Sequence, residues 1–489
     1  MRKKLLLWLM VLALALGLAV PVRAAGDPVE EFAVEFAGAV NRGKSEVTIK
    51  MDGTDVEAMM LAVLDRYPVL FHYFESVQWT YWTDRAEVVL QLKNTADPMN
   101  QIPVVDSEET LRAVLALALA QLKEQTTFVC TDGFFPDVEQ ISAILEELRH
   151  SDYLSFMGYY TYATSYVTYD NSDAVDFQIS FTYWEGLTLQ ELARWRAETE
   201  AAARELLRTT VAMDMPDYEK VLRIHDWVIE HTRYNTANMD EVGNNMAYGA
   251  LVRGSCVCQG YAEAFMLLAN ALGVETVYVT GDGYSEGSWE SHAWNAVKVQ
   301  GEWYMIDLTW DDPVTSDGSD VLRYDYFLVS GQQLSQDHRW ETGNYPSCEP
   351  GSLDADRVRD LVAQSAGGYQ LYDADCLVTK EETIDACSQV LAQNSWAMPG
   401  EAPEVTEPPT TEPENAGTIA PVNPVTPVEP QTPEEEPEEG GGWLVLLGIL
   451  LAVAALGATV TVIIIRKREE ERKRKRRRVT VEFSSDRKW

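Results

Sequence analysis

The sequence contains little cysteine, with six cysteines in 489 residues. So few cysteines exclude the disulfide-dense scaffolds of small secreted domains, in which cross-links replace a large hydrophobic core. Hydrophobic residues make up 46% of the chain, which has 14 Trp, 22 Tyr and 13 Phe. This composition excludes a largely disordered or collagen-like protein and indicates well-buried globular material. At this length we expect about two to four domains.

Positive charge is scarce between the two ends of the chain. Residues 27–465 hold 23 basic and 72 acidic residues, a net charge of -49, and the basic residues of 1–26 and 466–489 bring the formal net charge of the whole chain to -38. An acidic surface repels nucleic acid and anionic lipid. We therefore exclude nucleic acid as a partner of the bulk of the chain and interpret the acidic residues as an aid to solubility.

Cofactor motifs are also missing. The sequence has no dinucleotide fingerprint, no P-loop and no cluster of zinc ligands. Cys256 and Cys258 have a spacing at which both could bind one metal ion, but no second pair of His or Cys lies at a fitting offset. We therefore predict neither a cofactor nor a metal site.

The two basic ends have the patterns of an export signal and a membrane anchor. Residues 1–25 combine a basic start, a short apolar run and small residues at the exit, which is typical of a cleavable signal peptide. Residues 443–465 carry no charge over 23 positions, enough to span roughly 30 Å of hydrocarbon. The tail at 466–489 is rich in Lys and Arg, so the positive-inside rule places it in the cytoplasm. We expect a single-pass protein of the cell membrane whose head is extracellular.

Composition identifies the segment before this anchor as a stalk. Eleven of the 21 prolines lie between Pro399 and Pro437, mixed with Glu and Thr. Proline removes hydrogen-bond donors and the repeated acid prevents collapse, so we expect residues 399–442 to be disordered and extended. No LPxTG-like wall-sorting pattern is present, which leaves 443–465 as the anchor.

The N-terminal part has a pattern that repeats after 82 residues. Asp55 opens one helical stretch and Asp137 opens a similar one, and an alternating aromatic segment follows each. We predict two small α+β units, at 27–125 and 126–210. Each unit is expected to end in a second helix, at these positions: 107–124 and 187–209.

The aromatic segments of the two units allow two interpretations. Exposed rings in a row would form a platform for carbohydrate or peptide, but strands also favour aromatic residues for packing alone. We expect core packing for the following residues: Trp79, Tyr81, Trp82, Tyr159, Tyr160 and Tyr162.

The pattern changes after the second unit. Apolar residues recur at helical spacing over 217–232 and again over 257–272. A β-branched run at 274–280 predicts a buried strand. Two further strands, 293–299 and 302–309, flank Gln300-Gly301, a dipeptide typical of a tight hairpin.

Cys258 lies at the start of the second of these helices. A thiol there meets backbone N–H groups without partners and the positive end of the helix dipole, both of which favour the reactive thiolate. The same amides can hold the oxyanion that forms when an acyl group is attacked. A buried cysteine is more often inert packing, so its neighbours decide between the two interpretations.

His292 and Asp307 lie on the two strands of the predicted hairpin. If Gln300-Gly301 is a two-residue loop, Trp294 faces Asp307, and His292 lies one diagonal step away on the same face. A four-residue loop keeps this parity, whereas a three-residue loop places His292 on the opposite face. An Asp that holds one imidazole nitrogen leaves the other free to take the proton of a thiol.

These motifs together resemble a bacterial transglutaminase-like domain, within the papain-like thiol superfamily. The resemblance rests on these segments: Tyr218 to Trp227, Tyr248 to Leu251, Cys258 to Phe265, His292 to Asn295, Trp303-Tyr304, Asp307 to Pro313 and Tyr326 to Leu328. It implies an α+β core in which a helix bearing Cys258 packs on an antiparallel sheet bearing His292 and Asp307. We assign this domain to 211–340 and a C-terminal extension of the head to 341–398.

The resemblance also implies an activity. It makes Cys258 the nucleophile, His292 the general base and acid, and Asp307 the residue that orients His292. The expected reaction is acyl transfer from an amide, through a thioester, to an amine (cross-linking) or to water (hydrolysis). Extracellular proteins and peptides are the expected substrates, with cell-wall peptide as one candidate. The alternative is a catalytically idle head that binds peptide or wall polymer as a scaffold.

The cysteine next to the predicted nucleophile departs from the family pattern. The family does not require Cys256, and a bridge from it to Cys258 would shut off the nucleophile reversibly. Cys376 and Cys387 are a second candidate pair, and the sequence alone leaves both pairings open.

An acidic cluster after Asp307 invites comparison with the calcium sites of larger animal transglutaminases. The cluster lacks the spacing of an EF-hand, so we expect a solvated loop instead. Its members are Asp311, Asp312, Asp317 and Asp320.

Overall fold

The computed structural model describes most of the chain between residues 27 and 394. The described residues are 27–93, 99–168, 172–212, 214–285, 287–314, 321–365, 369, 376–394 and 399. The predicted signal peptide (1–25), transmembrane helix (443–465) and cytoplasmic tail (466–489) lie outside them, as does the predicted stalk beyond Pro399. Among the described residues, no helix combines the length and apolar character needed to cross a membrane.

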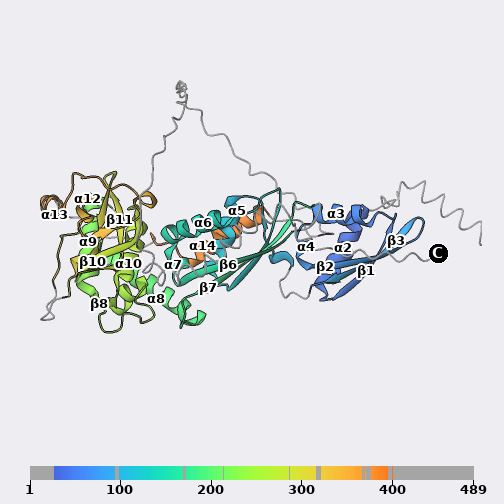
Figure 1. The fold of residues 1–489 in the computed structure, drawn as a ribbon, viewed down its shortest axis with the longest axis horizontal. Helices are drawn as coiled ribbons and strands as arrows, with labels where there is room; N and C mark the ends of the chain where they lie inside the picture. The colour runs from blue at the N-terminus through green and yellow to red at the C-terminus, as the bar shows by residue number, and fades with distance from the viewer. Residues whose placement is uncertain are drawn as a thin grey trace, which may run out of the picture. The chain divides into compact units, whose positions relative to one another are not determined.

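A three-stranded antiparallel sheet and its helices form the first N-terminal unit (Figure 1). Asp27 and Asp55 start the two longer helices by accepting hydrogen bonds from first-turn amides. Strand β3 lies between β1 and β2. The elements are α2 (Pro28–Asn41), β1 (Glu46–Asp52), α3 (Val56–Arg66), α4 (Leu70–Tyr73), β2 (Phe74–Tyr81) and β3 (Arg85–Leu92).

The second N-terminal unit also contains the order helix, strand, helix, short helix and hairpin. Its sheet has the order β4-β5-β7-β6, so β7 lies between β5 and β6 as β3 lies between β1 and β2. Asp137 caps α6 in the way that Asp55 caps α3. The elements are η1 (Met99–Gln101), β4 (Val104–Val105), α5 (Glu108–Ala120), β5 (Gln125–Cys130), α6 (Val138–Ser151), α7 (Tyr153–Phe156), β6 (Tyr159–Thr168), β7 (Val175–Tyr183) and α8 (Leu189–Thr210).

Helix α5 packs with this second unit, although the sequence pattern places the helix near 107–124 at the end of the first. It contacts α6, α7 and β5, and Leu111 and Leu115 join Phe128 in one apolar cluster. The unit therefore begins before the predicted boundary at residue 125. A helix between two sheets can cover either one, and its choice depends on the apolar surface within reach rather than on sequence order.

The prediction of core packing was wrong for two of the six aromatic residues, Trp82 and Tyr160, which are exposed. The other four are partly buried, and two of these, Tyr159 and Tyr162, pack against the main core. Since β2 and β6 are edge strands of their sheets, fewer neighbouring elements cover the rings that they carry.

A four-stranded antiparallel sheet covered by helix α10 forms the centre of the third part. The sheet order is β12-β11-β10-β13, and α10 packs on β10 and β11, which confirms the predicted α+β class. The elements are α9 (Asp217–His231), β8 (Arg233–Tyr234), the π-helical turn η2 (Gly249–Arg253), β9 (Ser255–Cys256), α10 (Cys258–Ala271), β10 (Thr276–Ser285), β11 (Ser288–Val299), β12 (Glu302–Ile306), α11 (Leu308–Asp311), α12 (Gly331–Leu334) and β13 (His338–Arg339).

The hairpin between β11 and β12 closes through the predicted two-residue turn. Gln300 and Gly301 both adopt a positive φ, of 54° and 85°, as a type I′ turn requires. Strand β12 ends one residue before Asp307, whereas the prediction continued it to residue 309. It ends there because the Asp307 side chain caps the following helix.

The C-terminal extension returns to the second N-terminal unit. Helix α14 packs on α5 and is drawn in orange among the helices of that unit in Figure 1. Thr383 donates a hydrogen bond to Asp152 at 2.6 Å, and Asn394 donates one to the carbonyl of Val104 at 3.1 Å. The extension consists of η3 (Thr342–Asn344), α13 (Ala355–Gln364) and α14 (Lys380–Gln393).

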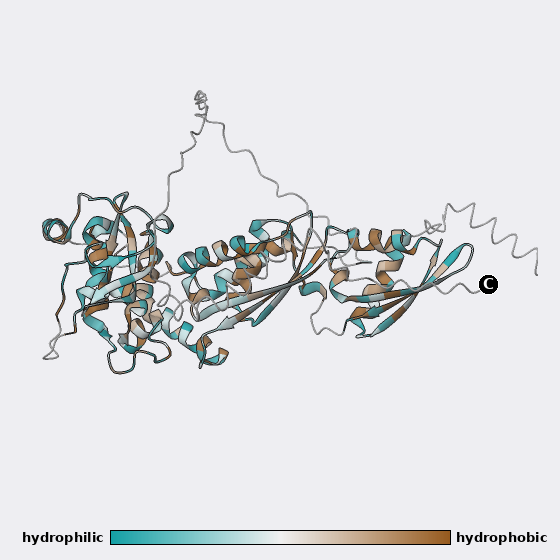
Figure 2. Ribbon diagram, in the orientation of Figure 1, coloured by the Kyte–Doolittle hydropathy of each residue, from teal (hydrophilic) through white to brown (hydrophobic). Residues whose placement is uncertain are grey.

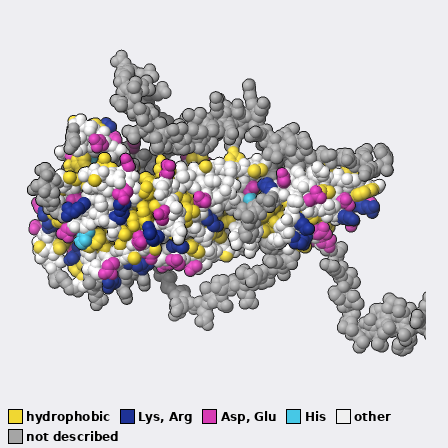
Figure 3. Space-filling view, turned by 90° about the horizontal axis from the view of Figure 1, so that it is seen from below, with side chains coloured by type: hydrophobic (Ala, Val, Ile, Leu, Met, Phe, Trp, Pro, Cys, Tyr) yellow, Lys and Arg dark blue, Asp and Glu magenta, His cyan; other side chains and the backbone are white. Residues whose placement is uncertain are grey.

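Figure 2 colours hydrophobic residues brown, and they occur along the helices and strands of all these layers. One continuous cluster of buried residues includes side chains of α5, α6, α10 and β11. The second N-terminal unit and the sheet of the third part therefore share a core. On the face drawn in Figure 3, the Lys and Arg side chains of the described residues are interspersed with Asp and Glu.

Candidate active site

Helix α10 begins at Cys258, as the sequence pattern predicts. Its N-cap is Val257, whose side chain makes no capping hydrogen bond, and first-turn amides have no partner inside a helix. A Cβ at Gly260 would lie 2.5 Å from the Cβ of Cys256 and 2.7 Å from the carbonyl oxygen of Asn244. Close packing against this first turn therefore requires glycine at position 260.

His292 lies in β11 and links Cys258 to Asp307. Its Nε2 is 2.7 Å from Oδ2 of Asp307, and the Cys258 side chain is close enough to the ring to help raise the pKa of His292. Since Nε2 faces the carboxylate, Nδ1 is the nitrogen left for the thiol. The side chain of His292 is 8% exposed and that of Asp307 is 1% exposed. The structure therefore brings the three predicted site residues together, nearly out of contact with water.

Asp307 is held in place by the start of α11. Its Oδ1 accepts hydrogen bonds from the amides of Thr309 at 2.9 Å and Trp310 at 3.3 Å. This capping leaves Oδ2 to face His292. A carboxylate fixed by two backbone amides cannot rotate away, so it orients the imidazole ring with little freedom.

The charges and hydrogen bonds that act on His292 and Asp307 together affect the pKa values of both groups more than burial does. Burial alone lowers the pKa of His292, but the charge and hydrogen bond of Asp307 raise it, with help from Cys258, to about 10. Burial alone raises the pKa of Asp307, but His292 and His338 lower it well below its usual range. Asp307 is therefore ionised, and it favours the protonated form of His292.

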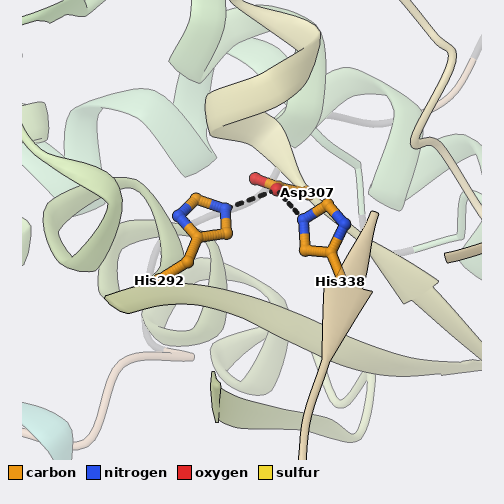
Figure 4. Close-up of side chains that lie close together, drawn as sticks. All are labelled: His292, Asp307 and His338. Carbon is orange, nitrogen blue, oxygen red and sulfur yellow. Dashed lines mark hydrogen bonds and ion pairs between the residues drawn. The ribbon is translucent and has the colours of Figure 1, made fainter. Parts of the chain in front are cut away.

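A second histidine, which the sequence analysis missed, shares the Asp307 carboxylate (Figure 4). Nε2 of His338 lies 3.1 Å from Oδ2 of Asp307, and its Nδ1 lies 2.7 Å from Oδ1 of Asp337. Strand β13 brings it there by pairing with β10, where Gly283 is opposite His338. Because the chain has only six histidines, each of them is a candidate site residue. No spacing rule, however, links residue 338 to a hairpin that ends near residue 306.

His292, Asp307 and His338 each place one donor atom within 4.8 Å of the others, close enough for a shared metal ion. A metal ion would have to displace the protons that both rings share with Asp307. It would also bind the nitrogen that orients His292 towards Cys258. We therefore assign these residues to a hydrogen-bond network and not to a metal site.

The acidic loop is not solvated as predicted where the structure describes it. Asp311 is fully buried and lies 3.1 Å from Nε2 of His225, and it also accepts a hydrogen bond from the amide of Tyr326. Asp312 is buried as well and accepts a hydrogen bond from the Tyr261 hydroxyl at 2.6 Å. These carboxylates stabilise the loop by binding protein donors. The other two members, Asp317 and Asp320, lie outside the described residues.

Neither of the two disulfides that the sequence left open is present. Cys256 and Cys258 are both free thiols, and so is Cys387, which excludes a bridge from it to Cys376. Cys256 is fully buried, and burial raises the pKa of its thiol well above the usual range. Cys258, in contrast, interacts with the imidazole of His292.

A largely buried ion pair joins α10 to the second N-terminal unit. Glu263 on α10 contacts Arg149 of α6 at 2.8 Å and accepts a hydrogen bond from the Tyr153 hydroxyl. The Arg149 guanidinium lies 3.8 Å from the centre of the Tyr278 ring on β10. Since removing one partner of a buried pair is costly, this contact ties the position of the Cys258 helix to the second unit.

Comparison with known families agrees with this geometry. Residues 204–308 match the family described as the transglutaminase-like superfamily. The chain carries a transglutaminase-like domain. The matched segment contains Cys258, His292 and Asp307, and it ends well before His338.

Known relatives of this transglutaminase-like chain match only part of it. Kyphoscoliosis peptidase of Homo sapiens is 30% identical over 149 residues, which are 27% of this chain and 22% of that protein. Kyphoscoliosis peptidase of Mus musculus is 28% identical over 166 residues, which are 31% of this chain and 25% of that protein. The chain thus matches a quarter or less of the length of these relatives.

A solved structure described as a TGase covers more of the chain, but at low similarity. It is 14% identical and has a TM-score of 0.22, and the match covers 65% of this chain and 82% of that one. The transglutaminase-like assignment rests on the family match and on the residues it contains.

Proposed function

We propose that this chain is a membrane-anchored, extracellular cysteine enzyme that transfers an acyl group from an amide through a thioester on Cys258. One observation carries the proposal: the His292 ring interacts with the Cys258 side chain, which helps to raise its pKa, and lies 2.7 Å from the Asp307 carboxylate. A nucleophile, a base and an orienting carboxylate brought together in this way form the arrangement that thiol acyl transfer requires. Peptide binding alone makes no use of it.

Before the first half-reaction, the thiol proton has already moved to His292, and the thiolate of Cys258 attacks the amide carbonyl carbon. The carbonyl electron pair moves onto oxygen, and the first-turn amides of α10 are placed to stabilise the resulting oxyanion. The imidazolium then gives its proton to the leaving amine. The carbon–nitrogen bond breaks, and the acyl group remains on sulfur as a thioester.

In the second half-reaction, an amine or water attacks the thioester and loses a proton to His292. An amine acceptor gives a new amide, which is a cross-link, and water gives a carboxylic acid. The sulfur leaves as a thiolate beside the imidazolium. Asp307 stays ionised throughout because its pKa is lowered, and it stabilises the imidazolium in both halves.

Protein or peptide substrates outside the cell, including cell-wall peptide, suit this site and the predicted topology. A cavity of about 310 Å³ lies where the second N-terminal unit meets α10, and Gln259, the neighbour of Cys258, lines it. Tyr159, Trp184 and Tyr278 line the same cavity. Its aromatic walls would hold an amino-acid side chain of the substrate.

A second candidate function is binding by a catalytically idle head. A hollow of about 700 Å³ lies on the second N-terminal unit, lined by Tyr160, Phe181 and Trp184 among others. Tyr160 is 48% exposed. Exposed aromatic rings beside a hollow favour peptide or wall polymer as the ligand.

Labelling distinguishes the two functions. The full-length chain in detergent is treated with a thiol-reactive amide analogue, and each cysteine is assayed by mass spectrometry. The enzyme proposal predicts a selective adduct on Cys258 that is absent in Cys258→Ala and retained in Cys348→Ala, a matched control because Cys348 is also a buried free thiol. Equal labelling of Cys258 and Cys348 would favour the binding module.

The location is tested separately. Protease added outside intact cells should remove the head and spare the basic tail at 466–489, because the positive-inside rule places that tail in the cytoplasm. Protection of the head would contradict the proposed orientation.

A further inference from the structure

His338 lies between two carboxylates with its side chain fully buried. Its Nδ1 is 2.7 Å from Asp337 and its Nε2 is 3.1 Å from Asp307. A neutral imidazole has one N–H group, so it can donate to one carboxylate only and turns a lone pair towards the other. Favourable contacts on both sides therefore require a proton on each nitrogen, which makes His338 an imidazolium.

Both carboxylates have the surroundings of ionised groups. The Tyr326 hydroxyl donates a hydrogen bond to the other oxygen of Asp337 at 2.7 Å. The other oxygen of Asp307 accepts from two backbone amides at the start of α11. Because both oxygens of each group act as acceptors, the protons in this network belong to the rings and the phenol.

The neighbours of His338 come from several elements. On β10, Gly283 is opposite His338 and carries no side chain, and the nearby Asp282 is paired with Arg339 at 2.8 Å. The Trp294 and Trp310 rings that contact it are uncharged. The titratable groups that face it are Asp337, Tyr326 from the segment before α12, Asp307 from the start of α11 and His292 from β11.

We propose that His338 is a positioning residue: a buried imidazolium that shares the Asp307 carboxylate with His292 and sets the pH range in which the Cys258–His292 pair reacts. The proposal rests on the proposed function of the triad. A fixed cation 3.1 Å from Oδ2 of Asp307 weakens the field of that carboxylate at His292. His338 also fixes the carboxylate through Oδ2, whereas the amides of α11 bind Oδ1.

The same arrangement occurs at the other end of α11. His225 lies 3.0 Å from Asp226 and 3.1 Å from Asp311. Burial lowers the pKa of His225, but the two carboxylates outweigh burial and raise the pKa above its ordinary value. His225 and His338 thus hold the two ends of one short helix, and only His338 shares its carboxylate with His292. His225 is therefore a matched control.

The sign of the expected effect follows from charge alone. Loss of a nearby positive charge makes each neighbouring group release its proton at higher pH. In His338→Gln, the amide can still donate to Asp307 but carries no charge, so both limbs of the reactivity profile of Cys258 should move to higher pH by about half a unit to one unit. Asp337→Asn removes the need for the second ring proton and loses a cation and an anion together, so the same shift should be smaller.

The test needs no known substrate. The full-length chain in detergent is alkylated with iodoacetamide over a range of pH, and the rate at Cys258 is followed by mass spectrometry in wild type, His338→Gln, Asp337→Asn and His225→Gln. We expect the shift in the first two variants, in that order of size, and no shift in His225→Gln. Slower alkylation with unshifted limbs in both His338→Gln and Asp337→Asn would show a merely structural role and overturn the proposal.

Nitrogen NMR of histidine-labelled protein gives an independent readout, since the chain has six histidines. We expect both ring nitrogens of His338 to be protonated in wild type near neutral pH and one of them to lose its proton in Asp337→Asn. A neutral ring in wild type would refute the inference even if Cys258 is reactive. If wild-type Cys258 is no more reactive than Cys348, the proposed function fails instead, and the nitrogen signals alone then decide the charge of His338.

Discussion

Cys256 and Cys258 are two residues apart, yet their surroundings are opposite. Cys256 ends strand β9, where it is fully buried against Gly249 and Gly260, and burial raises its pKa. Cys258 begins helix α10 and lies close enough to His292 to help raise the pKa of that imidazole. A strand-to-helix junction turns successive side chains in different directions. The comparison teaches that this junction, and not the residue type, selects the sulfur that can react.

The largest expected effect comes from removing the reactive thiol of Cys258 or the imidazole of His292. Cys258→Ala should abolish the acyl-enzyme, and His292→Ala should lower turnover by at least about a thousandfold, because the thiol and imidazole act as a unit. Cys256→Ala should retain the adduct. The measurement is mass spectrometry after an amide or ester probe. An adduct on Cys256, or full activity in His292→Ala, would contradict the assignment.

A smaller loss of activity is expected when the orienting carboxylate is neutralised. Asp307→Asn keeps the shape of the side chain but removes the charge that stabilises the His292 imidazolium. We expect turnover to fall by about a hundredfold, less than in His292→Ala. Steady-state rates of the two variants, compared at the same pH, check the order, and equal losses would show that shape matters less than we infer.

The same variant changes how stability depends on pH. The pKa of His292 rises from 6.5 to about 10 on folding, so its protonated form stabilises the fold fully below pH 6.5, and this contribution is lost as pH rises through about 10. In Asp307→Asn the main cause of the raised pKa is gone. The free energy of unfolding should then fall less between these pH values than in wild type. Urea unfolding at several pH values measures how the free energy of unfolding changes with pH in wild type and in the variant. Equal changes would refute the inference that Asp307 raises the pKa of His292.

The tight packing around Cys256 is tested by adding a methyl group at position 260. In Gly260→Ala the new methyl group would lie 2.5 Å from the Cβ of Cys256 and 2.7 Å from the carbonyl oxygen of Asn244. We expect a loss of about 1–3 kcal/mol in the free energy of unfolding. Gly343→Ala is the control, because nothing lies within 4 Å of its new methyl group. Equal stabilities of the two variants in urea would disprove tight packing here.

The smallest effect is expected from Cys256→Ala itself. Truncating a small buried side chain should cost about 1 kcal/mol of stability, and turnover should stay near that of wild type. Because Cys256 and Cys258 are both free thiols in the structure, added reductant should affect the variant and wild type equally. Activity is measured with and without reductant, and a dependence on reductant that only wild type shows would contradict this expectation.

Much of this site could be predicted because it is built from local patterns. The turn at Gln300-Gly301 sets the hairpin register through positive φ at both residues, and the register brings His292 near Asp307. Cys258 precedes an apolar helical period, which marks a helix start. One local error was the end of β12, where the Asp307 side chain caps α11 and stops the strand.

Other features could not be predicted because they depend on contacts between distant segments. Helix α14 packs on α5 more than 250 residues earlier in the chain, so sequence order gave the wrong partner for α5. The Arg149–Glu263 ion pair likewise joins residues 114 positions apart. The apolar and charged residues of a helix predict the type of surface on which it packs, but they do not identify the segment that provides this surface.

By itself, the sequence determined where the reactive elements begin and end: a helix start for Cys258 and paired strands for His292 and Asp307. These features arise from propensities, turn geometry and alternation, which act over a few residues. Only the tertiary structure decided that Cys256 is sealed, that Asp311 binds His225, and that His338 shares the carboxylate of the triad. A buried charge must find a partner wherever the folded chain brings one, and that partner can come from any part of the sequence.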